Sequence, residues 1–335
     1  LVWWADTLGL RKLCQAERAE ILHAHRGQEH WLAAAALRLS VRWDNPLPVL
    51  IRSRHILEAV RTHPANRWLY NRATARTLTA TRGILQRYLQ SGAFHPSRFV
   101  VLRGGVDARE FRPEQEGRAI RARLGIAEGD VTFGMTSSFV PIKGHMTALE
   151  ALAILRRRGL PARLLLASSG GDQDRVARHA AELDIADAVH FLGYRQDLPR
   201  ALSAADVGLF AARRSEGTSR VVLEWMALGR PVVATDVGCV RELLGDGKEG
   251  LIVPLENTGA LADAMERLVL DAALRRRLGA EARARAETEY DRQVWTARTE
   301  AIYREALGRP PAQPPPPSEA ATVSAGARAR GEPQA

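Results

Sequence analysis

Residues 215–235 read SEGTSRVVLEWMALGRPVVAT, and this stretch decides the fold. A short apolar run before it predicts a strand, Gly217 makes a turn, and a helix is predicted to begin at Thr218 or Ser219. Gly229 ends this helix, and an apolar, β-branched strand follows it. A glycine turn that leads from a strand into a helix offers free backbone N–H groups to an anion. The stretch therefore predicts a phosphate-binding element.

The same alternation continues on both sides of this stretch. Strands are predicted over residues 131–135, 163–167, 189–192, 206–210, 231–234 and 251–253, with helices between them, among them 145–158, 172–183 and 218–228. Strands that alternate with helices form right-handed βαβ units and a parallel sheet covered on both faces. We expect a complete doubly wound domain here.

The first part of the chain has a thinner version of this pattern. Strands are predicted over residues 21–24, 49–51, 77–80 and 99–102, with helices such as 31–39 and 67–76 between them. Four strands make only part of an open sheet, and the chain begins with Leu1 rather than Met, so we expect the opening βαβ units of this lobe to be missing. The predicted class is α/β, with two Rossmann-like doubly wound domains facing each other across a cleft.

Glycines and composition set the expected boundaries. Gly104-Gly105 predicts a hinge between an incomplete N-terminal lobe, residues 1–110, and a C-terminal lobe, residues 111–290. A last helix is expected over residues 291–308, returning toward the first lobe. The Pro- and Ala-rich tail, 309–335, is expected to be disordered.

The charge of the chain is concentrated in the first lobe. The formal net charge is +10; residues 1–110 hold 17 Lys and Arg against 8 Asp and Glu, and residues 111–335 hold 31 against 30. Such a lobe suits nucleic acid, an anionic membrane or a phosphorylated substrate, and equally an Arg-rich surface without a function. Cys14 and Cys239 are too few for a disulfide framework, and no apolar run is long enough to span a bilayer, so we expect a cytoplasmic protein.

Two acids stand in the deciding stretch. Glu216 lies just ahead of the predicted helix and Glu224 lies inside it among apolar residues, where an acid needs hydrogen-bond partners that ribose hydroxyls could supply. Taken singly, each acid has a structural explanation, because the helix dipole favours an acid at its start and most helical glutamates point to solvent.

The whole stretch resembles the retaining glycosyltransferases of family 4, which have the GT-B fold. Their mark is a Glu, seven residues and a second Glu, followed by A-x-G-x-P-V-V-A-T, as in the run from Glu216 through Glu224 to Thr235. The resemblance extends over residues 20–307, through Gly105-Val106-Asp107, Phe111-Arg112-Pro113, 191–195, Arg241-Glu242 and 246–254. It implies that Glu216 holds donor-sugar hydroxyls, that Glu224 holds the ribose, and that the backbone of Gly217, Thr218 and Ser219 cradles the diphosphate.

A second phosphate element is expected after the first strand of the same domain. Lys143-Gly144 matches the Lys-Gly pair of the family, but Ser138 stands where the family usually has an Arg that shares the diphosphate with the lysine. Arg220 could compensate for this Arg. Without the resemblance, Lys143 could merely begin a helix. Tyr194 and Arg195 complete the expected donor side, and Ala167-Ser168-Ser169-Gly170-Gly171 departs from the family's V-G-x-G.

Basic residues follow two strands of the first lobe. His25 and Arg26 follow one strand, and Arg54 and His55 end the next, at the edge where open α/β sheets bind ligands. The resemblance places His55 near the reacting centre, with His25, Arg26 and Arg54 lining the acceptor side. His23 and His25 could also form a same-face packing pair. No third metal ligand is evident, and we expect no metal and no cofactor.

The predicted activity is retaining transfer of a sugar from a nucleotide-diphosphate donor to a hydroxyl of a glycan or glycolipid. His55, Lys143 and Glu216 are the expected catalytic residues; a UDP-sugar is favoured, with a GDP-sugar as the alternative. The expected setting is cell-envelope polysaccharide or lipopolysaccharide synthesis, at the inner membrane face. Three rivals remain: a sugar-nucleotide-binding protein impaired by Ser138, a sugar-nucleotide epimerase, and a nucleic-acid binder, which lacks any recognisable reading module, so nucleic acid is not an expected partner.

Overall fold

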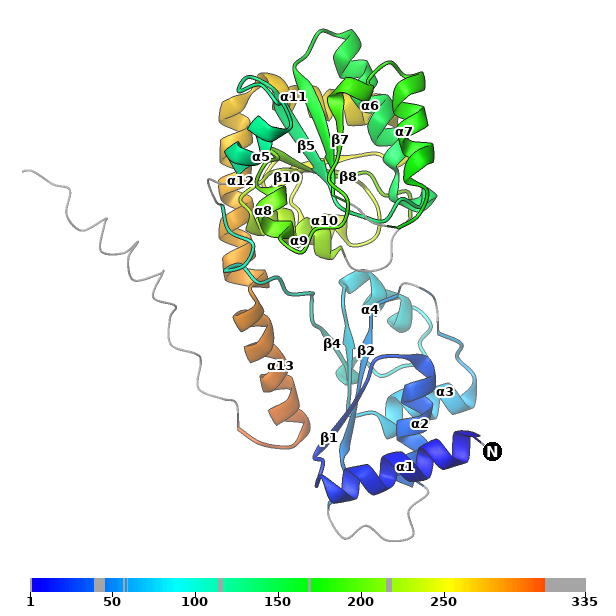
Figure 1. Ribbon diagram of the computed structural model, residues 1–335. Coiled ribbons are helices and arrows are strands. Elements are labelled where there is room, and N and C mark those ends of the chain that lie inside the picture. Colours follow the sequence, from blue (N-terminus) through cyan, green and yellow to red (C-terminus); the bar gives the residue numbers. More distant parts are fainter. Residues whose placement is uncertain are drawn as a thin grey trace, which may run out of the picture.

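The computed structural model describes residues 2–38, 46–56, 58, 60–113, 117–167, 170–214 and 219–310, and it has two lobes (Figure 1). The N-lobe extends to Gly104, and the C-lobe runs from Gly105 to Tyr290. The chain crosses from the first lobe to the second after strand β4 and returns to the first with helix α13. Two crossings between two α/β lobes agree with the predicted class.

The N-lobe contains one parallel sheet with strand order β1-β2-β3-β4. Its elements are α1 (Val2–Ala16), β1 (Ile21–Ala24), α2 (Gly27–Arg38), β2 (Val49–Arg54), α3 (Pro64–Trp68), the π-helix η1 (Leu69–Ala73), β3 (Arg76–Thr79), α4 (Arg82–Leu89), the 3-10 helix η2 (Pro96–Arg98) and β4 (Phe99–Val101). All four strands predicted from the sequence are confirmed within a few residues.

The helix predicted over residues 67–76 is confirmed in part, because helical structure runs from Pro64 to Ala73, three residues earlier at each end. The helix α3 already begins at Pro64, whose fixed φ suits a first helical position, and the ring of His63 accepts a hydrogen bond from the Asn66 N–H at 3.3 Å. The helix continues as the π-helix η1 to Ala73, and the chain is extended from Arg76. The local start signal therefore set this helix earlier than the apolar pattern indicated.

The C-lobe contains a six-stranded parallel sheet with strand order β10-β9-β8-β5-β6-β7. Its elements are α5 (Gly117–Arg123), β5 (Val131–Met135), η3 (Pro141–Lys143), α6 (His145–Arg157), β6 (Ala162–Leu166), α7 (Gln173–Glu182), η4 (Ala186–Ala188), β7 (Val189–Phe191), α8 (Leu198–Leu202), β8 (Val207–Phe210), α9 (Arg220–Ala227), β9 (Val232–Thr235), α10 (Val240–Leu243), β10 (Gly250–Val253), α11 (Thr258–Leu270), α12 (Ala272–Arg285) and η5 (Ala286–Tyr290). The six predicted strands are confirmed. The strand order reverses between β5 and β8, as in a doubly wound fold.

Two apolar layers cover the two faces of the C-lobe sheet. Helices α6, α7 and α11 pack on one face around Leu152, Leu164 and Met265, and helices α9, α10 and α12 pack on the other around Trp225 and Val240. A sheet covered on both faces presents only its strand ends to solvent. Ligand chemistry in this lobe is therefore expected at the carboxyl ends of the strands.

Helix α9 is seated on the sheet through Trp225, which is completely buried. The ring lies against Gly134 of β5 and Gly208 of β8; a Cβ atom at either glycine would come within 2.3 Å of it. Only glycine at both positions allows the indole to rest on the two strands that flank the order reversal. This contact fixes α9, and with it Glu224, over that point of the sheet.

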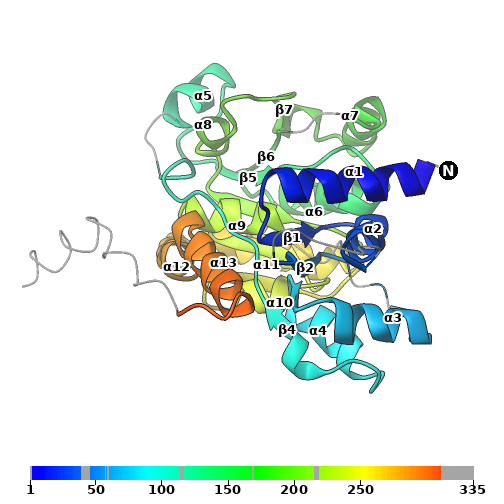
Figure 2. The ribbon, with the colours of Figure 1, turned by 90° about the horizontal axis from the view of Figure 1, so that it is seen from below.

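Helix α13 (Arg292–Ala306) lies along the N-lobe (Figures 1 and 2). Ile302 packs against Ile51 and Leu78, and the carboxylate of Glu305 contacts the Arg76 guanidinium at 2.6 Å. The helix predicted after Asp291 is confirmed. Of the tail for which disorder was predicted, residues 311–335 lie outside the described residues.

Candidate functional site

The C-lobe sheet has a natural binding crevice where its strand order reverses. Strands β5 and β8 are neighbours there, and the connections that leave their carboxyl ends run to opposite faces of the sheet, toward α6 and α9. In open α/β sheets, ligands bind in the crevice that this divergence leaves. The two stretches singled out in the sequence, the Lys143 loop and the stretch before α9, are these two connections.

A tight backbone arrangement holds the Lys143 loop beside the end of β8. Gly144 has φ +77°, and a Cβ atom there would lie 1.8 Å from the carbonyl oxygen of Ala211, so this position requires glycine. The N–H of Arg213 also donates to the carbonyl oxygen of Ile142 at 2.8 Å. Lys143, between Ile142 and Gly144, is therefore held at the reversal point, and its side chain is half-buried.

Glu224 lies on α9, and its carboxylate is buried. It is 6% exposed, and Arg220, one turn earlier, places its Nε 3.0 Å from Glu224 Oε1. Burial raises the pKa of Glu224 above its usual value, while the Arg220 guanidinium opposes that rise. Arg220 therefore partners the buried acid, for which the sequence suggested ribose hydroxyls as partners. Because its guanidinium is paired with Glu224, Arg220 does not stand in for the arginine that Ser138 replaces.

Ser219 is the first described residue before α9. It is 7% exposed and occupies the N-cap position, but its side chain makes no capping hydrogen bond to the helix. It contacts Cys239 instead: burial raises the pKa of that thiol, and a hydrogen bond with the Ser219 hydroxyl lowers it. Glu216, Gly217 and Thr218 lie outside the described residues, so their predicted roles stay predictions.

The remaining donor-side predictions lie farther from the reversal point or on its rim. Ser138 is exposed in the loop after β5. Tyr194 is 73% exposed, and Arg195 forms two hydrogen bonds with the carboxylate of Asp197 at 2.8 and 2.7 Å. Both follow β7, which is separated from β5 by β6. Backbone hydrogen bonds join the turn after β6 to the loop after β5: the Phe139 N–H donates to the Gly170 carbonyl oxygen, and the Asp172 N–H donates to the Phe139 carbonyl oxygen, both at 3.0 Å.

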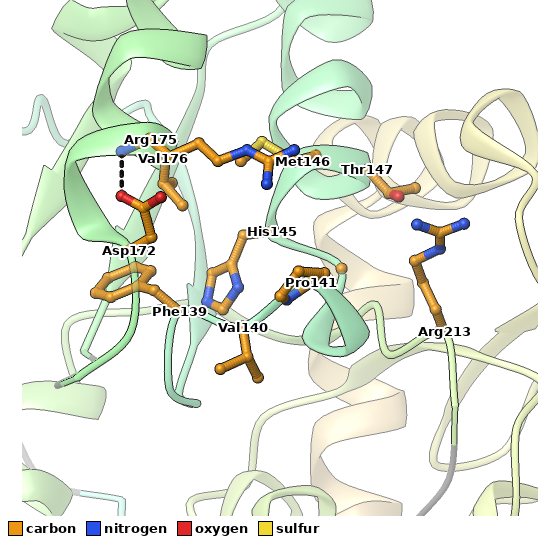
Figure 3. Close-up of a pocket in the computed structure, with 11 residues that line it drawn as sticks. Phe139, Val140, Pro141, His145, Met146, Thr147, Asp172, Arg175, Val176 and Arg213 are labelled. Atoms are coloured by element: carbon orange, nitrogen blue, oxygen red, sulfur yellow. Dashed lines mark hydrogen bonds between the residues drawn. The ribbon is translucent and has the colours of Figure 1, made fainter.

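A hollow of about 100 Å³ lies behind the Lys143 loop, on the α6 and α7 side (Figure 3). Phe139, Val140 and His145 line its wall, and Arg213 closes one end with its guanidinium paired to Glu256 at 2.7 Å. Burial and the nearby charge of Lys143 lower the pKa of His145 to about 4, so its imidazole is neutral at pH 7. This neutral ring supports the loop without adding charge to the crevice.

Three histidines form a stack at the carboxyl edge of the N-lobe sheet. The ring centroids of His23 and His25 are 4.3 Å apart, and those of His25 and His55 are 6.1 Å apart, nearly parallel at 3°. His25, Arg26 and His55 are exposed. The structure thus brings the predicted acceptor-side histidines together, and it places His23 and His25 as the packing pair that the strand alternation allowed.

Hydrogen bonds fix the base of this stack. His23 Nδ1 lies 2.6 Å from the Tyr303 hydroxyl of α13, and His23 Nε2 lies 2.8 Å from the Ser53 hydroxyl. Burial, followed by the charges of His25, His55 and Arg52, lowers the pKa of His23 to about 4. The His23 ring is therefore neutral, and both of its nitrogens form hydrogen bonds. No sequence signal connected Tyr303 with it, since the two residues are 280 positions apart.

The lobes also touch through Glu242, which the sequence argument noted only as part of a family motif. Its Oε2 accepts from the Arg82 N–H at 2.8 Å and its Oε1 from the Gly83 N–H at 2.9 Å, at the start of α4 in the other lobe. Arg103 Nε lies 3.8 Å from the same carboxylate. A carboxylate on helix N–H groups is stabilised by hydrogen bonds and by the helix dipole.

Two further observations concern the described residues alone. Among them, no cluster of three or more His, Cys, Asp or Glu side chains has a geometry that could hold a metal ion. None of the helices in the described part of the chain combines the length and the apolar character needed to cross a bilayer.

Comparison with known proteins identifies the family. A family model described as "Glycosyl transferases group 1" matches residues 117–285. A D-inositol 3-phosphate glycosyltransferase of Salinispora arenicola is 30% identical, over 96% of this chain and 76% of that protein. One of the same name from Saccharomonospora viridis is 36% identical over 61% of this chain. The chain spans 49% of the Saccharomonospora protein and 62% of a relative from Stackebrandtia nassauensis.

Solved structures show the same fold at low sequence identity. A glycosyltransferase from Rickettsia africae matches with a TM-score of 0.80 at 19% identity, covering 91% of this chain and 82% of that one. HepE of Anabaena, crystallised with UDP, matches with a TM-score of 0.77 at 21% identity, covering 90% and 81%. The two-lobed arrangement is thus the GT-B fold that the sequence predicted, and the chain belongs to the family of group 1 glycosyl transferases.

Proposed function

We propose that this chain transfers a sugar from a nucleotide-diphosphate donor to a hydroxyl of a glycan or glycolipid acceptor, with retention of the anomeric configuration. The observation that carries the proposal is the position of the Lys143 loop and of α9, which flank the reversal between β5 and β8. A cation and a helix start on two sides of one crevice suit a diphosphate.

The donor side has the charges that departure of a nucleotide requires. Negative charge grows on the diphosphate as the bond to the sugar breaks, and preorganised donors that meet it stabilise the transition state. Lys143 and the N–H groups at the start of α9 would be these donors, Ser219 included. Arg220 and Glu224 form an ion pair beside them that a ribose hydroxyl could join. Glu216 would hold hydroxyls of the sugar.

The comparisons support a nucleotide-sugar donor. HepE of Anabaena has been crystallised with UDP and with UDP-glucose, and the relatives described above carry the name glycosyltransferase. A UDP-sugar is therefore our first choice of donor and a GDP-sugar the second. Membership of family 4 is proposed with it, because that resemblance includes the two glutamates and the run up to Thr235.

The acceptor side is proposed at the histidine stack of the N-lobe. His55 and His25 present exposed imidazoles there, with Arg26 and Arg54 beside them. No described residue of this group is an evident covalent nucleophile, so the proposed step is a front-face substitution in which the leaving phosphate helps to take the acceptor proton. Neither a metal nor a cofactor is proposed, and activity that persists in EDTA is the expected result.

A second candidate is a protein that binds the nucleotide sugar without turning it over. The observations that favour it are the exposed Ser138 in place of the family's Arg and the engagement of Arg220 with Glu224. Losing one donor to the transition state lowers kcat by roughly 10²–10³-fold. If Ser138→Arg gains turnover without a change in donor affinity, this candidate is supported. If the wild type already transfers sugar as fast as Ser138→Arg, this candidate is excluded.

Cell-envelope polysaccharide or lipopolysaccharide synthesis is the proposed setting, at the inner face of the membrane. The charge of residues 1–110, with 17 Lys and Arg against 8 Asp and Glu, suits an anionic lipid surface. Co-sedimentation with anionic and with neutral vesicles tests the location. Equal binding to both would contradict it.

The experiment for the reaction uses the full chain with a panel of UDP- and GDP-sugars and polyol, glycan and glycolipid acceptors. NMR of the isolated product reads the configuration of the new anomeric bond. A retained configuration is expected. An inverted product would refute the proposed mechanism, and binding of UDP without transfer to any acceptor would favour the second candidate.

A further inference from the structure

Thr235 is the last residue of β9, and its side chain is 3% exposed. The pairing of β8 with β9 ends at Phe210 and Ala234. Beyond that pair, the Thr235 hydroxyl donates to the Ala212 carbonyl oxygen at 2.6 Å and lies 3.3 Å from the Phe210 carbonyl oxygen. The side chain therefore holds the chain that leaves β8, where pairing between the two backbones has stopped.

The segment held by this hydroxyl is also where the Lys143 loop is attached. The carbonyl oxygen of Ala211 packs against Gly144 so closely that a Cβ atom there would lie 1.8 Å away. The N–H of Arg213 donates to the Ile142 carbonyl oxygen at 2.8 Å, which places Arg213 beside the loop (Figure 3). The carbonyl group that Thr235 holds lies between these two contacts. The position of the loop therefore follows the position of residues 211–213.

The other side of the crevice is fixed in a different way. Helix α9 is seated on the sheet by Trp225, which rests on Gly134 and Gly208. The start of α9 therefore takes its position from the sheet itself, whereas the Lys143 loop takes its position from residues 211–213. The spacing between the lysine and the helix start depends on where β8 releases the chain, and the Thr235 hydroxyl acts at that point.

Burial makes this hydrogen bond hard to replace. Ala211 is 1% exposed and Ala212 is 3% exposed, so water has little access to the carbonyl oxygen that Thr235 holds. A buried acceptor that loses its donor costs more than the bond itself contributes, which favours movement of the segment toward another donor. Small displacements of groups that meet a reacting centre have large effects on binding and rate.

We propose that the Thr235 hydroxyl is a positioning group for the donor diphosphate. By holding the exit of β8, it sets the Lys143 ammonium at the distance from the start of α9 that lets both meet one diphosphate. The inference rests on the proposed function, because the diphosphate is the ligand that the two sides are proposed to share. Thr235 is assigned no contact with the substrate.

Two replacements at this position separate the hydroxyl from the rest of the side chain. Thr235→Val removes the hydroxyl and keeps a β-branched side chain in the core. Thr235→Ser keeps the hydroxyl and loses the methyl group. If the hydrogen bond is what positions the loop, Thr235→Ser should behave like wild type and Thr235→Val should not.

Two control variants come from the same lobe. Thr132→Val makes the same replacement at the second residue of β5, which is completely buried and whose hydroxyl has no hydrogen-bond partner among the described residues. Asp271→Ala removes the acceptor of the Leu274 N–H, 2.8 Å away, at the start of α12. It lowers stability without touching the crevice, because α11 returns from the carboxyl ends of the strands before it reaches Asp271.

Hydrogen exchange at the Arg213 amide is the first readout and needs no ligand. The amide of Leu164, inside β6, serves as the internal reference. Relative to it, exchange at Arg213 is expected to be roughly 5- to 20-fold faster in Thr235→Val than in wild type. Thr235→Ser, Thr132→Val and Asp271→Ala should keep the wild-type ratio.

Calorimetric titration with UDP is the second readout. The affinity is expected to fall roughly 5- to 20-fold in Thr235→Val and to be retained in Thr235→Ser and Thr132→Val. Asp271→Ala should also bind like wild type, although its melting temperature falls. In a Lys143→Ala background, Thr235→Val should cause no further loss, since the hydroxyl acts through that lysine.

Three results would overturn the inference: wild-type exchange at Arg213 in Thr235→Val, wild-type UDP affinity in the same variant, or an equal loss of affinity with and without Lys143. Failure of the proposed function looks different, because wild type itself would then bind no UDP. In that case exchange at Arg213 would still decide whether the Thr235 hydroxyl holds the exit of β8.

Discussion

Replacing Glu242 by alanine should loosen the contact between the lobes. The carboxylate accepts two hydrogen bonds from the first N–H groups of α4, Arg82 at 2.8 Å and Gly83 at 2.9 Å. The third N–H of the helix, that of Ile84, is already satisfied by the Thr81 hydroxyl within the N-lobe. The C-lobe residue Glu242 therefore caps the first two N–H groups of α4, and the N-lobe residue Thr81 caps the third.

The magnitude follows from what remains after the change. A hydrogen bond to a charged group contributes about 1.5–3 kcal/mol and a helix cap about 0.5–2 kcal/mol. Arg82 is exposed and the Glu242 side chain is 19% exposed, so water can replace part of the loss. We expect about 1–3 kcal/mol, which corresponds to roughly 5- to 150-fold faster opening of these amides.

Hydrogen exchange at Arg82 and Gly83 measures this directly, and small-angle scattering reports whether the lobes move apart. Glu242→Gln, which keeps one acceptor oxygen, should give an intermediate effect. Glu256→Gln, which removes an exposed partner of Arg213, is the control and should leave both readouts unchanged. Unchanged exchange at both amides in Glu242→Ala would refute the reasoning.

Three other outcomes are expected. Tyr303→Phe removes the hydroxyl at 2.6 Å from the His23 ring and should lower the free energy of unfolding by about 0.5–1.5 kcal/mol; an unchanged denaturant midpoint would contradict the bond. Burial raises the pKa of Glu224 above 4.5 in the folded state, so its contribution to stability is complete below pH 4.5 and is lost as the pH rises through the raised pKa. Glu224→Gln should remove this pH dependence, and a variant with the wild-type stability–pH curve would contradict it. Gly144→Ala should disrupt the Lys143 loop, since the Cβ atom would meet the Ala211 carbonyl oxygen at 1.8 Å; unchanged melting temperature and UDP affinity would show that the loop adapts.

The strands and their direction could be predicted because short apolar runs alternate with longer helical segments along the chain, the pattern of parallel βαβ units. The pairing of the Lys143 loop with the end of β8 could not, because it depends on close approach of Gly144 to Ala211, a contact of residues 67 positions apart. The helix predicted at 67–76 lies three residues earlier for a local reason, the start signal at His63-Pro64.

The sequence indicated more candidate site residues in the C-lobe than in the N-lobe. The spacing of Arg220 and Glu224 by four residues on a helix already allowed their ion pair, yet an acid among apolar neighbours drew attention to ligands instead. Glu242 and Tyr303 act through contacts with residues far away in the sequence. Such contacts leave no periodic signal in the chain.

The central claim is that a nucleotide diphosphate binds at the crevice between β5 and β8, with Lys143 as its cation. The most direct measurement is calorimetric titration of UDP into wild type, Lys143→Ala and Lys248→Ala, an exposed lysine of the same lobe. We predict one UDP per chain for wild type and Lys248→Ala, and a loss of roughly 10- to 100-fold in affinity for Lys143→Ala. No binding to wild type, or equal affinity in all three proteins, would contradict the claim.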